Sequence, residues 1–220
     1  MSSSSHVGAV FFDVDGTLVP GTSSSVFLAG FLGHHDELAA AEDAYAAGEL
    51  DNRQVSELDA KAWAGVTGEQ VSRLLDALPL VAGIAETVSW CRRNRLAPVL
   101  ATLAWWPVGS HLTGRFGFHA FGGPRLEVVD GRFTGRVAHH FDEYDKRDLA
   151  LAQARDLGLS AASCGAVGDS RSDLPLFASA AVSVAFNASG AARASATVAV
   201  DGHDLRAVLP ALDRLVTAVP

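Results

Sequence analysis

The stretch VGAVFFDVDGTL, residues 7–18, decides the fold of this chain. Its short apolar run predicts a buried strand over Val7–Asp13, and Gly16 then marks a turn. Asp13 and Asp15 fall where that strand ends. Because ligands bind outside the carboxyl ends of the strands in open parallel sheets, both carboxylates are expected at a ligand-binding edge.

A second stretch, SCGAVGDSRSDL over residues 163–174, has the same arrangement. It predicts a strand over Ser163–Val167, followed by Asp169 and Asp173. If the two strands are neighbours, four carboxylates gather at one edge, where they repel one another unless a cation lies among them. A single acid at a strand end is more often a turn former or a helix N-cap. Two such motifs instead favour a metal site, and Mg²⁺ prefers carboxylate and phosphate oxygens.

Around these motifs, strand-like and helix-like stretches alternate, which predicts an α/β fold with a doubly wound, Rossmann-like parallel sheet. The expected strands are Pro98–Thr102, Val182–Phe186 and Thr197–Val200, and the expected helices are Ile84–Asn94, Asp148–Leu157, Leu174–Ser179 and Leu205–Val216. A two-residue period on both sides of Asp130-Gly131 predicts a small β-hairpin.

Residues 21–82 have a different character, because β-branched residues thin out and apolar positions recur with helical spacing. Gly33, Gly48 and Gly65 separate these segments where helix ends would fall. We therefore expect a cap of about four short helices inserted after the first strand, with residues 1–20 and 83–220 forming the α/β core.

Composition and charge narrow the function classes. Hydrophobic residues make up 49% of the 220, charged residues 19%, and the formal net charge is −8. This is a globular composition, and the acidic balance argues against a nucleic-acid or anionic-membrane partner. No apolar run reaches the ~18 residues that cross a bilayer, and Met1–His6 lacks the basic start of a signal peptide, so we expect a cytoplasmic protein. Cys91 and Cys164 are expected to be buried free thiols.

The two acidic motifs resemble signatures of the haloacid dehalogenase superfamily. The run from Asp13 to Leu18 looks like the first signature, and the run from Gly168 to Asp173 looks like the fourth. Thr102, at the end of an apolar strand, and Lys146, near the start of a helix, fall where the family places a Ser or Thr and a Lys. The helical insertion and the tail resemble the phosphoserine-phosphatase-like branch.

The resemblance implies a magnesium-dependent phosphatase. Asp13 would be the nucleophile that forms an aspartyl-phosphate. Asp15 would protonate the leaving oxygen and then deprotonate water, work that is worth about 10²- to 10⁴-fold in rate. By analogy with the family, Asp13, Asp169 and the backbone carbonyl of Asp15 would hold the metal.

The other motif residues would support that chemistry. Thr102 and Lys146 would bind phosphoryl oxygens and stabilise the transition state. Asp173 would orient Lys146 or complete the surroundings of the metal. Taken singly, Thr102 is typical of an ordinary strand residue, and Lys146 is typical of a solvated cation at a helix start. The order of the four signature residues along the chain favours a catalytic role for both.

Three features bear on specificity. Phosphoserine phosphatases carry a Glu soon after the first signature that reads the substrate ammonium, but here no acid appears before Asp36, so phosphoserine is predicted to be a poor substrate. Trp105 and Trp106 follow Thr102 and would either line a substrate pocket or pack the next helix. The adjacent pairs His34-His35 and His139-His140 lack zinc spacing and are expected to be solvent-facing or incidental.

The sequence therefore predicts an enzyme that hydrolyses a small phosphomonoester metabolite. One alternative on the same fold is a phosphotransferase or mutase, in which an organic hydroxyl replaces water. Another is a non-catalytic binding module, against which the four filled signature positions argue. The substrate, the pathway and the oligomeric state are not fixed by the sequence, because a fold does not determine a substrate.

Overall fold

The computed structural model describes residues 6–217. The stretch Met1–His6, for which the sequence predicts no signal peptide, lies outside these residues except for His6. Six parallel strands form one sheet in the order β3-β2-β1-β6-β7-β8. The strands are β1 (Gly8–Phe12), β2 (Leu96–Ala101), β3 (Ala120–Gly122), β6 (Cys164–Gly168), β7 (Val182–Phe186) and β8 (Val198–Val200). The predicted α/β fold is thereby confirmed, although the short strand β3 was not expected.

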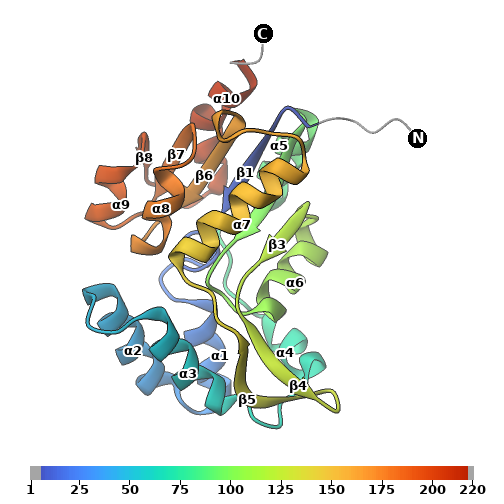
Figure 1. Ribbon diagram of the computed structural model, residues 1–220, viewed down its shortest axis with the longest axis vertical. Coiled ribbons are helices and arrows are strands. Elements are labelled where there is room, and N and C mark those ends of the chain that lie inside the picture. Colours follow the sequence, from blue (N-terminus) through green and yellow to red (C-terminus); the bar gives the residue numbers. More distant parts are fainter. Residues whose placement is uncertain (1–5, 218–220) are drawn as a thin grey trace.

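Helices cover both faces of this sheet, as a doubly wound fold requires (Figure 1). The core helices are α5 (Ile84–Arg93), α6 (Trp106–Phe116), α7 (Glu143–Asp156), α8 (Leu174–Phe177), α9 (Gly190–Ser195) and α10 (Leu209–Thr217). Side chains of β1 alternate between two hydrophobic clusters: Val10 and Phe12 pack with α5, α6 and α10, whereas Ala9 and Phe11 pack with α7, α8 and α9. Because every residue of β1 is buried, the strand is apolar throughout.

Four helices lie between β1 and α5 and form the cap, which sits beyond the carboxyl ends of the strands (Figure 1). They are α1 (Ser24–Leu32), α2 (His35–Ala47), α3 (Asn52–Ala62) and α4 (Gly68–Leu75). Capping boxes at Asp51 and Thr67 begin α3 and α4. Gly33 and Gly48 end α1 and α2 in the left-handed conformation, which glycine adopts without strain. The number of cap helices agrees with the sequence pattern.

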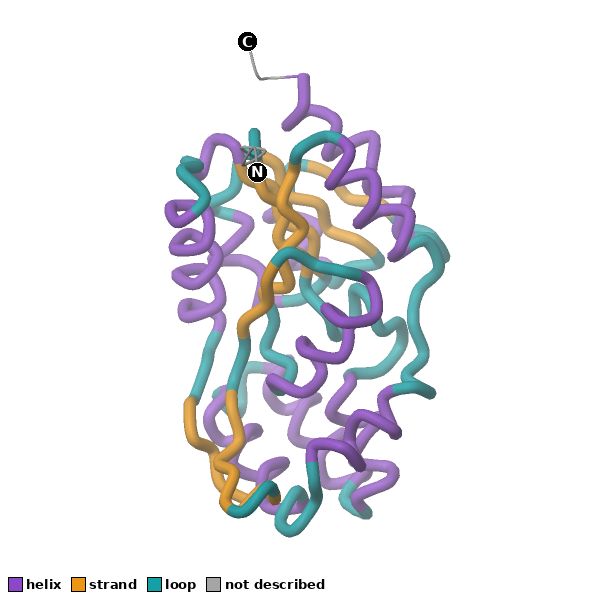
Figure 2. Tube along the Cα trace, turned by 90° about the vertical axis from the view of Figure 1, so that its right-hand side faces the viewer, coloured by secondary structure: helices purple, strands orange, loops and turns teal. Residues whose placement is uncertain are grey.

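The hairpin of β4 (Arg125–Val129) and β5 (Arg132–His139) extends away from the sheet and packs on the cap (Figure 2). The Phe133 carbonyl accepts a hydrogen bond from Gly65, and the Phe133 ring meets Trp63 edge-on at 5.3 Å. The sequence pattern assigned this hairpin to the core, because it lies within residues 83–220. Its contacts with Gly65 and Trp63 are contacts with the cap, so we propose to count the hairpin with the cap.

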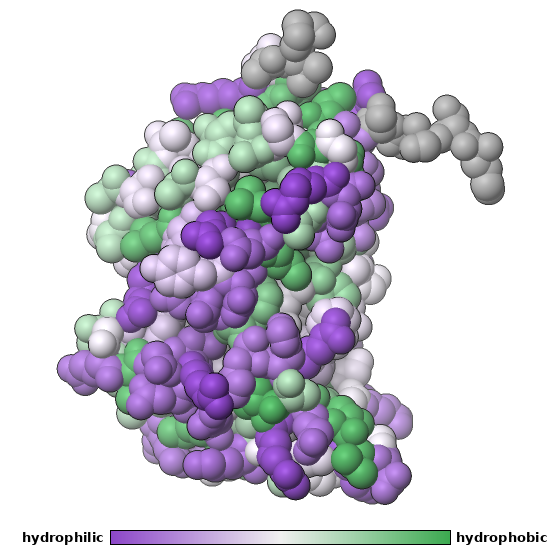
Figure 3. Space-filling model, viewed as in Figure 1, coloured by the Kyte–Doolittle hydropathy of each residue, from purple (hydrophilic) through white to green (hydrophobic). Residues whose placement is uncertain are grey.

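The surface is mainly hydrophilic over the cap, and hydrophobic side chains show at the turn end of the hairpin, where Val128 and Val129 are exposed (Figure 3). Cys91 and Cys164 are buried free thiols, as expected. Among residues 6–217, no helix has both the length and the apolar composition needed to cross a membrane.

Candidate active site

The neighbouring strands β2, β1 and β6 end side by side beneath the cap. Phe12 pairs with Leu100 on one side and with Val167 on the other, so the residues that follow these three strands share one edge. Asp13 continues this pairing, since its amide donates to the Val167 carbonyl at 2.9 Å. The structure therefore brings together the strand-end residues that the sequence singled out.

Lys146 approaches the same edge from the first turns of α7. Its ammonium is fully buried, 3.1 Å from Oδ1 of Asp13 and 2.6 Å from Oδ1 of Asp173. Burial alone would lower the pKa of Lys146, but the two carboxylates raise it above its ordinary value. The predicted helix start at Asp148 is too late, because Asp142 caps α7 and places Lys146 inside the helix.

Asp173 organises the loop after β6. Its Oδ1 accepts from Lys146, and its Oδ2 accepts from the amides of Asp169 and Ser170 at 2.9 and 3.0 Å. Both oxygens of Asp173 are therefore engaged by protein donors. This leaves Asp13 and Asp169 as the carboxylates with the greater freedom to bind another group.

Asp169 faces the first motif across the gap between β1 and β6. Its Oδ1 accepts from the Thr17 hydroxyl at 3.1 Å. Gly16 has a φ of 82°, and a β-carbon there would collide with the Asp169 carboxylate, so glycine is required for two reasons. Burial, followed by the charges of Asp13 and Asp173, raises the pKa of Asp169 to about 8.

Asp13, Asp169 and Asp173 offer oxygens that all lie within 4.8 Å of one another, a group that could hold a metal ion. Burial raises the pKa of Asp13 to about 7, with Lys146 opposing the shift. Carboxylates held this close repel one another unless a cation lies among them, and their oxygens are hard ligands of the kind that Mg²⁺ prefers. The residues present therefore fit the metal that the fold family implies.

Asp15 points toward the cap rather than into this group. Its Oδ1 accepts from the amide of Ser24 at 2.6 Å, at the start of α1. Burial raises the pKa of the Asp15 carboxyl, and the hydrogen bonds from Ser24 oppose the shift. The geometry thus sets the Asp15 side chain between the strand edge and the cap, where it can exchange a proton with a bound molecule.

A cavity of about 420 Å³ separates the strand edge from the cap. Its core side includes Asp13, Asp15, Thr102, Asp169 and Arg171, and its cap side includes Leu38, Glu42, Tyr45, Asn52, Val55 and Asp59. Thr102 is buried, and its hydroxyl accepts from the Ala104 amide at 3.0 Å. The cavity combines acidic groups with an apolar wall and has the size of a small metabolite.

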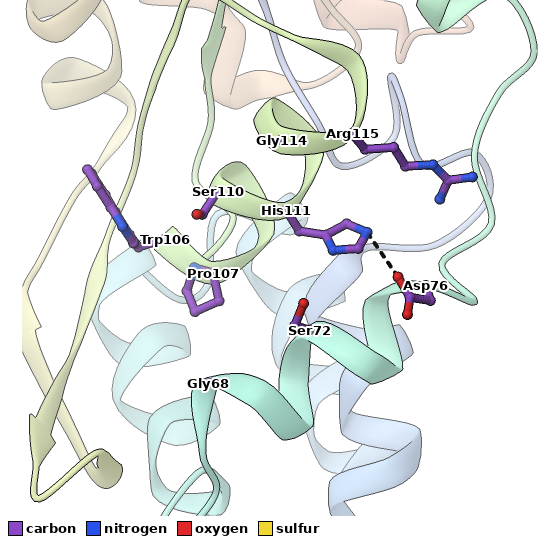
Figure 4. Close-up of a pocket in the computed structure, with 9 residues that line it drawn as sticks. All are labelled: Gly68, Ser72, Asp76, Trp106, Pro107, Ser110, His111, Gly114 and Arg115. Atoms are coloured by element: carbon purple, nitrogen blue, oxygen red, sulfur yellow. Dashed lines mark ion pairs between the residues drawn. The ribbon is translucent and has the colours of Figure 1, made fainter.

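The two adjacent tryptophans take different places. Trp105 is 2% exposed and lines the cavity. Trp106 lines a separate groove between α4 and α6 (Figure 4). The centre of its ring lies 3.7 Å from the Arg125 guanidinium and 4.3 Å from the centre of the Phe121 ring. In that groove His111 faces Asp76 across 3.9 Å. Trp105 therefore lies on the wall of the cavity, whereas Trp106, the first residue of α6, is not among its lining residues.

Three residues that line the cavity, Glu42, Asp59 and Arg171, were not predicted from the sequence. Glu42 accepts from the Ser23 hydroxyl at 2.6 Å, and burial raises its pKa to about 7. Arg171 donates to the Tyr45 carbonyl at 2.6 Å and stacks on the Tyr45 ring. Asp59 is buried, and His34 is only 9% exposed and lies 2.7 Å from it, so His34 does not face solvent. Only Arg171, inside the second motif, had a signal in the sequence.

The chain is similar to known proteins in both sequence and structure. The family model of haloacid dehalogenase-like hydrolases matches residues 10–178. A phosphoserine phosphatase of Streptomyces coelicolor is 30% identical over 91% of this chain, and one of Albidiferax ferrireducens is 28% identical over 91%. The chain spans 49% of the first relative's length and 87% of the second's.

A solved structure described as a phospho-aspartyl intermediate analogue of phosphoserine phosphatase shares the fold. Its TM-score is 0.83 at 22% identity, over 92% of this chain and 97% of that one. Since the family model also covers most of the residues, this chain belongs to the haloacid dehalogenase-like hydrolase family.

Proposed function

We propose that this chain is a magnesium-dependent phosphatase that hydrolyses a small phosphomonoester through an aspartyl-phosphate at Asp13. The observation that carries the proposal is the placement of Asp13, buried at a strand end, 3.1 Å from Lys146 and on the wall of a 420 Å³ cavity. Relatives named phosphoserine phosphatases support ester hydrolysis as the reaction.

In the first step, a carboxylate oxygen of Asp13 attacks the phosphorus of the ester, and the bond from phosphorus to the organic oxygen breaks. Lys146 and the Thr102 hydroxyl bind phosphoryl oxygens whose charge develops in the transition state. Asp15 gives its proton to the departing oxygen, which leaves as an alcohol. The raised pKa of Asp15 keeps a proton available for this step.

In the second step, Asp15 removes a proton from a water molecule, whose oxygen attacks the phosphorus of the aspartyl-phosphate. The bond between phosphorus and Asp13 breaks, inorganic phosphate leaves, and both carboxyl groups return to their starting forms. When bound by Asp13, Asp169 and the backbone carbonyl of Asp15, Mg²⁺ would neutralise phosphoryl charge. Asp173 would hold Lys146 and the loop that carries Asp169.

The direct test is release of inorganic phosphate from p-nitrophenyl phosphate and from a panel of phosphorylated metabolites. We expect turnover with Mg²⁺ and without any added acceptor alcohol. Transfer that requires an acceptor would instead identify a phosphotransferase, and no turnover of any phosphomonoester would contradict the proposal.

Chelation of divalent cations with EDTA is expected to reduce turnover to the background rate. Without a cation, the acidic group at Asp13 and Asp169 repels a phosphate dianion. Phosphate release is measured before chelation, after it, and after Mg²⁺ is restored, with circular dichroism as the control for folding. Full activity of the metal-stripped protein would show that the acidic group does not act through a metal.

A phosphomonoester that carries an amine and no carboxylate is expected to be a better substrate than phosphoserine. The sequence showed no acid soon after the first signature that could bind a substrate ammonium. Glu42 of α2 lines the cavity and can take that role. Among the described residues that line the cavity, Arg171 is the only cationic side chain. Its guanidinium already donates hydrogen bonds to the Tyr45 carbonyl and to Glu143. The substrate carboxylate would thus meet Glu42 and Asp59 without a free cation to pair with.

We expect kcat/KM to be at least about tenfold higher for phosphoethanolamine than for phosphoserine, roughly 1.4 kcal/mol. In Glu42→Gln the preference should shrink, while turnover of p-nitrophenyl phosphate, which has no amine, should change little. A preference for phosphoserine of similar size would show that Arg171 leaves Tyr45 to bind the substrate carboxylate.

A further inference from the structure

We propose that Asp59 is a positioning residue that ties the cap to the catalytic core through the indole of Trp105 and so fixes one wall of the substrate cavity. The contact itself is independent of the reaction, but its effect on turnover rests on the proposed phosphatase function. Asp59 lies on α3 of the cap, and Trp105 lies in the turn that follows Thr102 in the core.

The buried carboxylate of Asp59 is hydrogen-bonded to three nitrogen atoms. It is 2% exposed; its Oδ2 accepts from Nε1 of Trp105 at 2.6 Å, and its Oδ1 accepts from Nε1 of Trp63 at 3.1 Å. Nε2 of His34 lies 2.7 Å from Oδ1. Burying a carboxylate costs free energy unless hydrogen bonds compensate, and bonds to an ionised acceptor are shorter and stronger than neutral ones.

The three donors come from different parts of the molecule. His34 precedes α2 and Trp63 ends α3, so these two bonds stay within the cap. Trp105 belongs to the core, and its bond to Asp59 is the one of the three that crosses the boundary between cap and core. Its 2.6 Å length makes it the shortest of the three.

The turn that carries Trp105 is part of the active site. The amide of Ala104 donates to the hydroxyl of Thr102, and Trp105 then serves as the N-cap residue of α6. Both Trp105 and Asp59 line the cavity. Anchoring the indole therefore fixes the cavity wall next to Thr102 and the distance between cap and core at that wall.

Trp63 provides a matched control. Trp63→Phe and Trp105→Phe each delete one indole N–H from the same carboxylate and remove the same atoms. Trp63 is fully buried, packs on Trp105 and Phe133, and is absent from the cavity wall among the described residues. Both variants weaken packing, but only Trp105→Phe cuts the bond between cap and core.

The experiment measures kcat and KM for p-nitrophenyl phosphate in Trp105→Phe and Trp63→Phe, each alone and combined with Asp59→Leu. We expect KM to rise at least about tenfold in Trp105→Phe, and kcat/KM to stay within about twofold of wild type in Trp63→Phe even if its melting temperature falls. In the Asp59→Leu background, which offers no acceptor, the effect of Trp105→Phe should shrink to less than about threefold, because the two residues act through one bond.

An undiminished Trp105→Phe effect in Asp59→Leu would mean that the indole acts by touching substrate alone, and this would overturn the proposal. Equal losses in both Trp→Phe variants would overturn it as well, since they would reflect packing only. Amide hydrogen exchange gives a readout that does not need turnover: Trp105→Phe should raise exchange in the turn from Thr102 to Trp105, and Trp63→Phe should not. This measurement separates failure of the proposed Asp59–Trp105 link from failure of the phosphatase proposal. Unchanged exchange in Trp105→Phe would contradict the proposed link.

Discussion

Replacement of Lys146 by methionine is expected to abolish phosphate release and to lower the free energy of unfolding by about 3–5 kcal/mol at pH 8. The ammonium is fully buried between Asp13 and Asp173, at 3.1 and 2.6 Å. Methionine keeps most of the apolar stem but removes the charge, which leaves two buried carboxylates without their cation. Removing one partner of a buried ion pair is costly because the other charge remains desolvated.

The stability loss should depend on pH in a defined direction. Without Lys146, the pKa of Asp13, already about 7, rises further, because the cation that opposed the shift is gone. A carboxyl whose pKa is raised in the folded state costs nothing below its unfolded pKa, where both states are protonated. The cost grows as pH rises toward the folded pKa. The defect relative to wild type should therefore be small near pH 4 and largest above pH 7.

Urea denaturation of wild type and Lys146→Met at pH 5 and pH 8 measures this difference. Lys61, the other lysine of the chain, is exposed on α3, so Lys61→Met is the matched control and should change neither stability nor turnover appreciably. An equal stability loss at both pH values would point to packing rather than charge as the cause. Retained turnover in Lys146→Met would remove Lys146 from the catalytic machinery.

The fold and the centre of the site could be predicted because they depend on local patterns. Buried strands read as short apolar runs, and the parallel arrangement places Asp13, Thr102 and Asp169 at one edge without any knowledge of the loops. Lys146 was predicted from its place between Thr102 and Asp169 in the order of the family's signature residues. The start of its helix was missed because Asp142, as N-cap, begins α7 before the apolar pattern does.

The cap side of the cavity could not be predicted in the same way. Glu42 and Asp59 lie on the cap helices α2 and α3, and the docking of the cap on the core places them at the cavity. Trp105 and Trp106 are adjacent in sequence, but one precedes a helix and the other begins it, so they face different cavities. Specificity is set by such contacts between distant segments, which a single sequence does not reveal.

Asp13→Asn and Asp15→Asn are both expected to stop turnover, yet they should fail at different steps. Asp13→Asn lacks the nucleophile, so no phosphoenzyme can form from any substrate. Asp15→Asn keeps Asp13 and Lys146 in contact but lacks the acid and the base. A good leaving group needs little help from an acid, so p-nitrophenyl phosphate should still phosphorylate Asp13 in this variant.

Hydrolysis of that intermediate should then stall, because Asp15 is the base for the attacking water and its Oδ1 is held in place by the Ser24 amide. Intact-protein mass spectrometry should show a gain of about 80 Da, one phosphoryl group, on Asp15→Asn and none on Asp13→Asn. One burst of p-nitrophenol per enzyme should accompany the gain. Asp145→Asn, an exposed carboxyl on α7, serves as a control that should turn over normally. An adduct on Asp13→Asn, or one that maps by peptide mass to another residue, would show that Asp13 is not the nucleophile and that the cavity performs a different reaction.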